Sequence, residues 1–332
     1  MTQRYFAADS FWNTPIEDNP VIDPRNEHFI SLLKKDGLGG WGINLHQWTI
    51  PVYETNASTH CYDIAVRSIP DDLLAQYGLS KWVGVGDRFG HGPGFGQNVP
   101  IPDAAIPDPE EDAHFAIVDW EKKKIWDMWA CKKNEDGSWE SNTGMVYDLD
   151  GSGVFDDIDF GIQNGESIHF YGPSRAAGVP AIAGLIMHDE VVAGEINHKL
   201  ACATWVNALK EHVWPATWTD GFVPGGIPEG AVIQLDPELD LDQFDFLPGE
   251  RAVAKTMQVY GMVDVDNARG NALYGEGLWG KPELSWDGLL TPHGLENIPL
   301  DSFRVLKVGD TIKMGDTDRV TPDEARLVTV LE

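Results

Sequence analysis

The stretch AHFAIVDWEKKKIWDMWACKKNEDGSWES, residues 113–141, carries the pattern that decides the fold class. Its short apolar runs are separated by two charged turns, at residues 121–124 and 134–137. Runs of this length, rich in β-branched and aromatic residues, are typical of strands, and turns of this size join antiparallel neighbours. We therefore expect a mainly β fold, a β-sandwich or jelly-roll-like scaffold with a few short peripheral helices.

The rest of the chain has the same character. Gly 35 and Pro 21 are spread over all 332 residues, which favours many short strands over long helices. Helical spacing and end signals predict helices at residues 23–37 and 248–262, a short helix at 70–78, and two helical turns that begin at Asp189. We expect one integrated domain over residues 1–332, with a possible sub-boundary near residue 225.

Charge limits the classes of partner. Lys+Arg 24 against Asp+Glu 53 gives a formal net charge of -29, and such a field repels phosphate backbones and anionic lipid surfaces. We expect no nucleic-acid partner. No apolar run approaches the ~20 residues of a membrane helix, so we also expect no membrane insertion. The three cysteines, Cys61, Cys131 and Cys202, show no zinc-binding spacing and allow at most one disulfide.

The segment DLDGSGVFDDID, residues 148–159, resembles an EF-hand-type calcium loop. Hard cations prefer oxygen ligands, and calcium would relieve the repulsion among its carboxylates. The sequence therefore predicts a structural Ca²⁺, and the alternative is a solvated acidic turn. The expected ligands are the side chains of Asp148, Asp150, Ser152, Asp156 and Asp159 and the backbone carbonyl of Val154.

Common catalytic signatures are absent from the sequence. It holds no GxSxG, no GxxxxGK[ST], no HExxH and no GxGxxG after a strand. A surplus of tryptophan remains, Trp 13 in all, and exposed rings on a sheet can stack on the apolar faces of sugars. We name Trp126, Trp129 and Trp12 as substrate-binding candidates, although most aromatic residues in β proteins simply pack in the core.

The remaining polar residues fit two kinds of sugar chemistry. Elimination on a uronate needs a base, a cation that neutralises the carboxylate and an acid for the leaving oxygen. Hydrolysis needs a pair of carboxyl groups, for which Asp119, Asp127 and Glu195 are candidates. The catalytic candidates for the two reactions together are His114, His198, Tyr171, Arg175 and Asp127.

Eight segments along residues 10–305 carry a resemblance to known proteins. They are SFWNTPIEDNP (10–20), VPIPDAAIPDPEEDAH (99–114), IWDMW (125–129), GVPAIAGLI (178–186), GEINHKL (194–200), VWPA (213–216), IPEGAVIQLDPELD (227–240) and VYGMVDVDNARGNAL (259–273). In this order they resemble a largely uncharacterised family of bacterial, usually exported proteins, and His114 and His198 fall on motif positions of that family. The resemblance implies one integrated unit and extracellular work at cell walls or polysaccharides, although the chain begins without an export-signal pattern.

Two functions remain open on these grounds. The first is a carbohydrate-active enzyme, a polysaccharide lyase or glycoside hydrolase on a calcium-stabilised β scaffold, secreted or at the cell surface. The alternative is a non-catalytic protein: a calcium-stabilised glycan-binding module or a structural component of a cell surface or virion. In both, the expected partner is a polysaccharide or glycan.

Overall fold

The structure is a computed structural model that describes residues 4–35, 39–67, 91–92, 94–155, 162–163, 166–167 and 173–313. The described chain is mainly β, which confirms the predicted fold class. The short helix predicted at residues 70–78 lies outside the described residues. The helices of the described chain are α1 (Asn26–Lys34), α3 (His188–Ala193) and α4 (Pro248–Val259).

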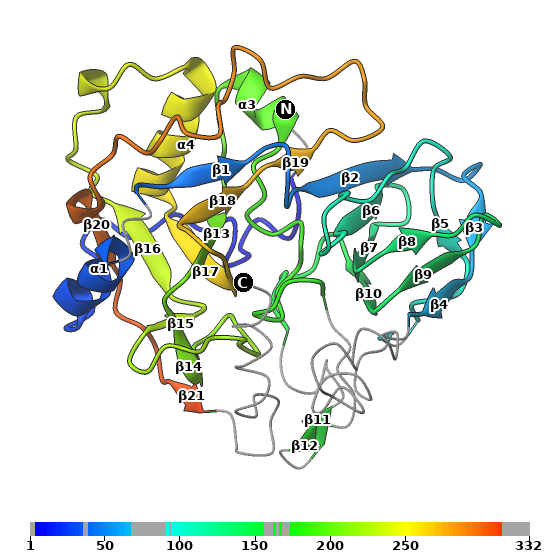
Figure 1. The fold of residues 1–332 in the computed structure, drawn as a ribbon, viewed down its shortest axis with the longest axis horizontal. Coiled ribbons are helices and arrows are strands. Elements are labelled where there is room, and N and C mark those ends of the chain that lie inside the picture. Colours follow the sequence, from blue (N-terminus) through cyan, green and yellow to red (C-terminus); the bar gives the residue numbers. More distant parts are fainter. Residues whose placement is uncertain are drawn as a thin grey trace.

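A six-stranded sheet occupies the left half of Figure 1. It mixes parallel and antiparallel pairs, because β13 runs parallel to β17 and β1 runs parallel to β18. Its strands, in spatial order, are β1 (Gly42–Asn44), β18 (Ala272–Tyr274), β13 (Leu200–Thr204), β17 (Met262–Asn267), β16 (Val232–Leu235) and β20 (Phe303–Val305).

A five-stranded sheet lies to its right and contains the predicted meander. Three of its strands pair antiparallel, whereas β2 joins β6 in parallel, a pairing that an all-antiparallel sandwich would not contain. Its strands, in spatial order, are β10 (Thr143–Asp148), β7 (Lys124–Trp129), β6 (Phe115–Asp119), β2 (Ile50–Thr55) and β19 (Glu276–Gly277).

Smaller sheets and two short 3-10 turns complete the described chain. The sheets are β3 (Cys61–Tyr62) with β5 (Val99–Pro100); β4 (Ile64–Val66), β9 (Trp139–Ser141) and β8 (Lys132–Lys133); β15 (Ile227–Glu229), β14 (Asn207–His212) and β21 (Ile312–Lys313); and β11 (Ile162–Gln163) with β12 (Glu166–Ser167). The 3-10 turns are η1 (Leu241–Gln243) and η2 (Leu300–Ser302).

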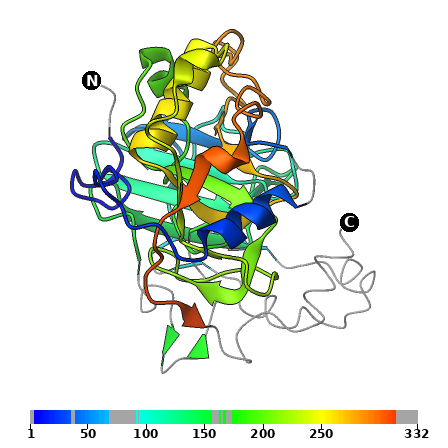
Figure 2. The same ribbon diagram turned by 90° about the vertical axis from the view of Figure 1, so that its left-hand side faces the viewer.

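Alternation along β13 shows how the layers are built. Successive side chains of a strand point to opposite faces. Leu200 and Cys202 belong to the core cluster that also contains α1 and α4, whereas Ala201 and Ala203 belong to a cluster shared with the five-stranded sheet. The six-stranded sheet is therefore covered by helices on one face, as Figure 2 shows for α1 and α4, and packs against the second sheet on the other.

The helices confirm the predicted apolar stripes. Phe29, Ile30 and Leu33 of α1 are buried, but the helix begins at Asn26, whereas the predicted range 23–37 has Asp23 as its cap and Pro24 as its first helical residue. The backbone N–H of Arg25 instead donates to the Asp23 carboxylate just before the helix. The helix-side core runs from residue 29 to residue 305 and so crosses residue 225. None of the helices in the described ranges is both long and apolar enough to span a membrane.

Candidate functional site

Asp127, in the middle of β7, lies at the centre of a buried polar cluster that is the candidate functional site. Its carboxylate is 0 % exposed and accepts three hydrogen bonds: from the Ser174 N–H (3.0 Å), the Ala181 N–H (2.6 Å) and the Tyr147 hydroxyl (3.0 Å). A buried carboxylate is tolerated only when such donors replace water. Burial still raises the pKa of Asp127. The group therefore ties the segment around residues 174–181 to the five-stranded sheet.

His114 and Arg175 lie beside this framework. The His114 ring, 3 % exposed, places Nδ1 3.1 Å from the Ser174 hydroxyl. Burial, with a smaller contribution from Arg175, lowers the pKa of His114 to about 3, so the ring is neutral near pH 7. Of the predicted catalytic candidates, the structure places His114, Asp127 and Arg175 around one segment, residues 174–181. Their burial means that they support the site from beneath rather than contact a polymer.

Arg175 is the unusual member of this group. Its guanidinium is 0 % exposed and lies over the Tyr274 ring at 3.8 Å from the centroid. Nη2 donates to the Ala181 carbonyl at 3.1 Å, whereas Nε and Nη1 have no hydrogen-bond partner among the described residues. An unpaired buried cation is costly, so nearby negative charge must offset it.

Two half-buried carboxyl groups interact electrostatically with this cation, and the ionised form of Asp112 contributes negative charge beside it. Arg175 acts on both Asp112 and Asp266, lowering pKa values that burial raises more strongly. Asp220 and Asp112 raise the pKa of Asp266 further, to well above its ordinary value. Asp112 also accepts a hydrogen bond from the indole of Trp129 at 3.1 Å, which favours its ionised form. Trp129 and Arg175 therefore favour the anion of Asp112, whereas the neighbouring carboxylates favour the protonated form of Asp266.

A second carboxyl pair lies next to them. The carboxyls of Asp220 and Glu229 interact with each other, and burial raises the pKa of both, which favours a protonated form. Burial and the Asp220 charge raise the pKa of Glu229 well above its ordinary value, so Glu229 keeps the proton. Asn207 Nδ2 donates to Glu229 at 2.9 Å and to Asp264 at 3.3 Å, which links the pair to β17.

A β-bulge between β13 and β17 explains why Asp264 and Asp266, two residues apart on β17, lie on opposite faces of the sheet. In the β13–β17 register Cys202 lies opposite Asp264 and Ala203 lies opposite Asp266, so Val265 is the extra residue. Cys202 and Ala203 belong to the cores on opposite faces of the sheet. Bulges re-aim side chains in this way and are frequent next to functional sites. Asp266 thereby shares the face of Ala203, which packs toward the five-stranded sheet.

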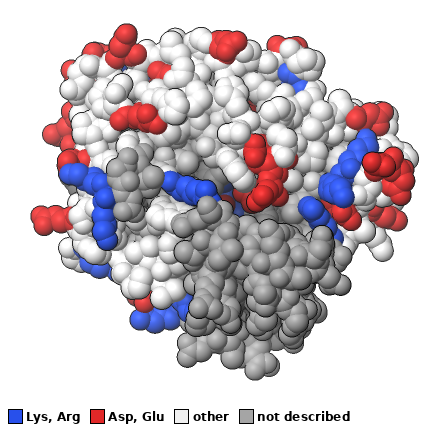
Figure 3. All heavy atoms as spheres, viewed as in Figure 1, with Lys and Arg blue, Asp and Glu red and all other residues white. Residues whose placement is uncertain are grey.

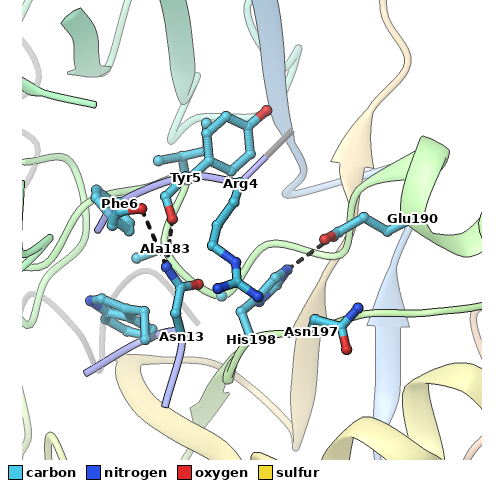
Figure 4. Close-up of a pocket in the computed structure, with 11 residues that line it drawn as sticks. Arg4, Tyr5, Phe6, Asn13, Ala183, Glu190, Asn197 and His198 are labelled. Carbon is cyan, nitrogen blue, oxygen red and sulfur yellow. Dashed lines mark hydrogen bonds and ion pairs between the residues drawn. The ribbon is translucent and has the colours of Figure 1, made fainter. Parts of the chain in front are cut away.

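His198 and Trp12 lie in a different place, a small pocket at the N-terminal segment (Figure 4). The volume open to water centres is about 70 Å³. The residues that line it are Arg4, Tyr5, Phe6, Trp12, Asn13, Ile182, Ala183, Gly184, Glu190, Asn197 and His198. Two predicted site residues are thus brought together here, apart from the hydrogen-bonded group of His114.

The His198 ring is held as an imidazolium. Nδ1 lies 2.7 Å from the Lys199 carbonyl and Nε2 lies 2.9 Å from the Glu190 carboxylate, and both of these partners only accept hydrogen bonds. Burial opposes the charge, but Glu190 and the Lys199 carbonyl outweigh it and raise the pKa of His198. A ring with both N–H groups engaged has no lone pair to accept a substrate proton. His198 therefore anchors α3 to β13 rather than acting as a base.

The other predicted site residues lie in different parts of the structure. Trp126 packs in the core of the five-stranded sheet, which is an ordinary structural role. Trp129 is half-buried, and its indole donates to Asp112. It therefore lies beside the cluster of Asp112, Asp220, Glu229 and Asp266, which we call the acid group. Tyr171 lies outside the described residues. Asp119 is buried, and its Oδ1 accepts from the backbone N–H groups of the following turn.

The described part of the calcium-like loop does not gather its oxygens around one point. The Asp148 carboxylate accepts from Lys124 at 2.5 Å and the Asp150 carboxylate accepts from Lys123 at 2.6 Å. The Ser152 hydroxyl donates to the carbonyl of Val154, which is itself an expected ligand. Among the described residues no group of three or more His, Cys, Asp or Glu side chains could hold a metal ion. Asp156 and Asp159 lie outside them, and calcium binding stays a prediction.

The described surface in Figure 3 carries both signs of charge. Acidic groups are frequent along its edges, and basic side chains are interspersed with them rather than joined into one continuous patch on the described part of this face. This arrangement agrees with the strong net negative charge of the sequence and offers no broad basic surface to a polyanion on that face.

The sequence analysis missed Asp112, Asp220, Glu229 and Asp266. One signal was available: MVDVD, residues 262–266, sets two acids into an otherwise apolar strand, where an unpaired charge would be expensive. The chain was also compared with known proteins. No protein-family model matches it, and neither a curated protein nor a solved structure shows a significant match.

Proposed function

We propose that the protein is a carbohydrate-active enzyme of the glycoside hydrolase type, with Asp112 and Asp266 as its catalytic carboxyls. The observation that carries the proposal is two half-buried carboxyls in contrasting surroundings beside a buried guanidinium: the Trp129 indole donates to Asp112 at 3.1 Å, whereas Asp220 and Asp112 raise the pKa of Asp266. Glycoside hydrolysis uses one carboxyl as a general acid and a second in ionised form. Environments that separate two pKa values in this way assign the roles.

Asp266 is the proposed general acid. Its raised pKa keeps the proton available at a pH where an ordinary aspartate has lost it. Burial raises the pKa of Asp112, but the Trp129 indole and Arg175 both stabilise its anion, and Asp112 is therefore the proposed base or nucleophile. Arg175, Asp127 and His114 are positioning residues, since their burial keeps them from touching a polysaccharide.

Hydrolysis of a neutral glycan is favoured over elimination on a uronate. Elimination needs a cation that contacts the substrate carboxylate, and Arg175 is fully buried. The accessible groups around it are themselves acidic, so a uronate would meet repulsion from Asp112 and Asp220. The ring of Trp129 beside Asp112 supplies an apolar surface for a sugar.

The test is incubation with neutral polysaccharides and, separately, polyuronates, followed by assays for new reducing ends and for unsaturated uronates. We expect reducing ends from a neutral glycan. Asp112→Asn and Asp266→Asn should each lower the rate at least a hundredfold, whereas Asp287→Asn, an exposed aspartate in a loop, should leave it unchanged. Unsaturated products would show that the reaction is elimination. Binding without new ends from any glycan in the panel would refute the enzyme in favour of a binding protein.

A further inference from the structure

The pocket around Arg4 differs from the acid group in composition. Its floor is apolar and buried, formed by Phe6, Trp12 and Ile182. Its rim is polar and exposed, formed by Arg4 and Asn197. A concave apolar surface with a few fixed polar groups is the usual form of a small-molecule site. Such a lining suits a molecule with one apolar face and several hydroxyl groups.

The polar groups of the pocket supply both hydrogen-bond donors and acceptors. Asn13 Nδ2 donates to the carbonyls of Tyr5 (2.8 Å) and Ala7 (2.9 Å), which fixes its amide and leaves Oδ1 as an acceptor turned toward Arg4 (Figure 4). The guanidinium of Arg4 contributes donors only. A hydroxyl both donates and accepts, so vicinal hydroxyls can satisfy this mixture.

The charges of the pocket nearly cancel. Arg4 and the His198 imidazolium are positive, and Glu190, which binds His198, is negative. Asp189 and Glu276 act on the neighbouring Tyr5 and oppose the remaining positive charge. A ligand with its own full charge would therefore gain little here. The balance favours a neutral molecule.

The volume of the pocket narrows the choice of ligand. One water needs about 10–15 Å³ of volume open to water centres, so about 70 Å³ holds on the order of five waters. Five waters at about 30 Å³ of liquid volume each have roughly the bulk of one hexose ring. We propose that this pocket binds a single neutral sugar unit, separately from the acid group. The choice of a sugar rests in part on the proposed function, but the pocket and its test do not require cleavage.

The test is calorimetric titration of the full chain with D-glucose, D-galactose and D-mannose, and with acetate and D-glucuronate as charged probes. We expect one neutral hexose to bind with one site per chain. Arg4→Ala should weaken that binding at least tenfold, whereas Arg251→Ala, another exposed arginine, on α4, should not change it. Circular dichroism checks that both variants are folded.

Three results would overturn the proposal: no heat from any neutral hexose, equal affinity in Arg4→Ala and Arg251→Ala, or tighter binding of acetate or glucuronate than of the hexose. The double variant Asp112→Asn/Asp266→Asn separates the two sites. It should lose cleavage and keep hexose binding, and Arg4→Ala should keep cleavage. Loss of hexose binding in the double variant would move the sugar to the acid group and refute the pocket.

Discussion

Tyr147→Phe probes the framework that holds the acid group in place. The Tyr147 ring is buried between Phe6 and Phe155, and its hydroxyl donates to Asp127 at 3.0 Å. Burial and the nearby carboxylate raise the pKa of Tyr147 well above its ordinary value, so the hydroxyl keeps its proton throughout the working range of pH. The substitution removes one hydrogen bond and leaves the ring packing unchanged.

The expected cost follows from that single bond. A hydrogen bond to a charged group contributes about 1.5–3 kcal/mol, and two N–H donors remain on Asp127, so we expect a loss of about 2 kcal/mol. For a chain of 332 residues that corresponds to a fall in melting temperature of roughly 3 °C. Urea unfolding should show a lower midpoint with an unchanged slope. Tyr260→Phe is the control, because its hydroxyl bonds to none of the described residues. A loss below about 0.5 kcal/mol would refute the assigned role of Asp127.

Three further predictions concern other parts of the structure. Because the folded-state pKa of His198 is raised, its contribution to stability should be complete below the unfolded value and disappear as pH rises through the folded one, and Glu190→Gln should flatten this dependence in thermal melts. Glu229 has a raised pKa as a carboxyl, so the unfolded chain loses that proton first and stability should fall as pH rises above the ordinary glutamate range; Glu229→Gln should remove the fall, and an unchanged slope would contradict the protonated assignment. Gly184→Ala should destabilise the fold by more than 1 kcal/mol in urea unfolding, because φ is +71° and an added Cβ would lie 2.3 Å from the Ala201 nitrogen; a neutral effect would show that this crossing can relax.

The sequence predicted the local structure better than the pairing of its parts. Apolar spacing placed the meander of residues 113–141 and the helices at α1 and α4, because periodicity is set by which face each residue buries. It could not predict that β13 runs parallel to β17, since the partner of a strand is chosen by contacts distant along the chain. The start of α1 was wrong by two residues, because a hydrogen bond within the preceding turn competes with the helix.

The candidate site was predicted in part for the same reason. His114, Asp127 and Arg175 stood out as polar residues within apolar or motif-bearing segments, and folding brings them together. Their burial, which makes them supports, depends on layers that no short window of sequence describes. Asp266 was missed because its orientation is produced by a bulge, and a bulge interrupts the alternation from which orientation is inferred.

The chain passes from β18 to β19 through Gly275 alone, so one short stretch belongs to both large sheets. An added Cβ at Gly275 would lie 2.9 Å from the Asn44 carbonyl oxygen, so the backbone packs closely against β1 at this position. The two sheets therefore cannot slide past one another without breaking this seam. This short connection limits relative movement of the two sheets. It therefore also limits movement of Asp266, on β17, relative to Asp112, in the segment before β6.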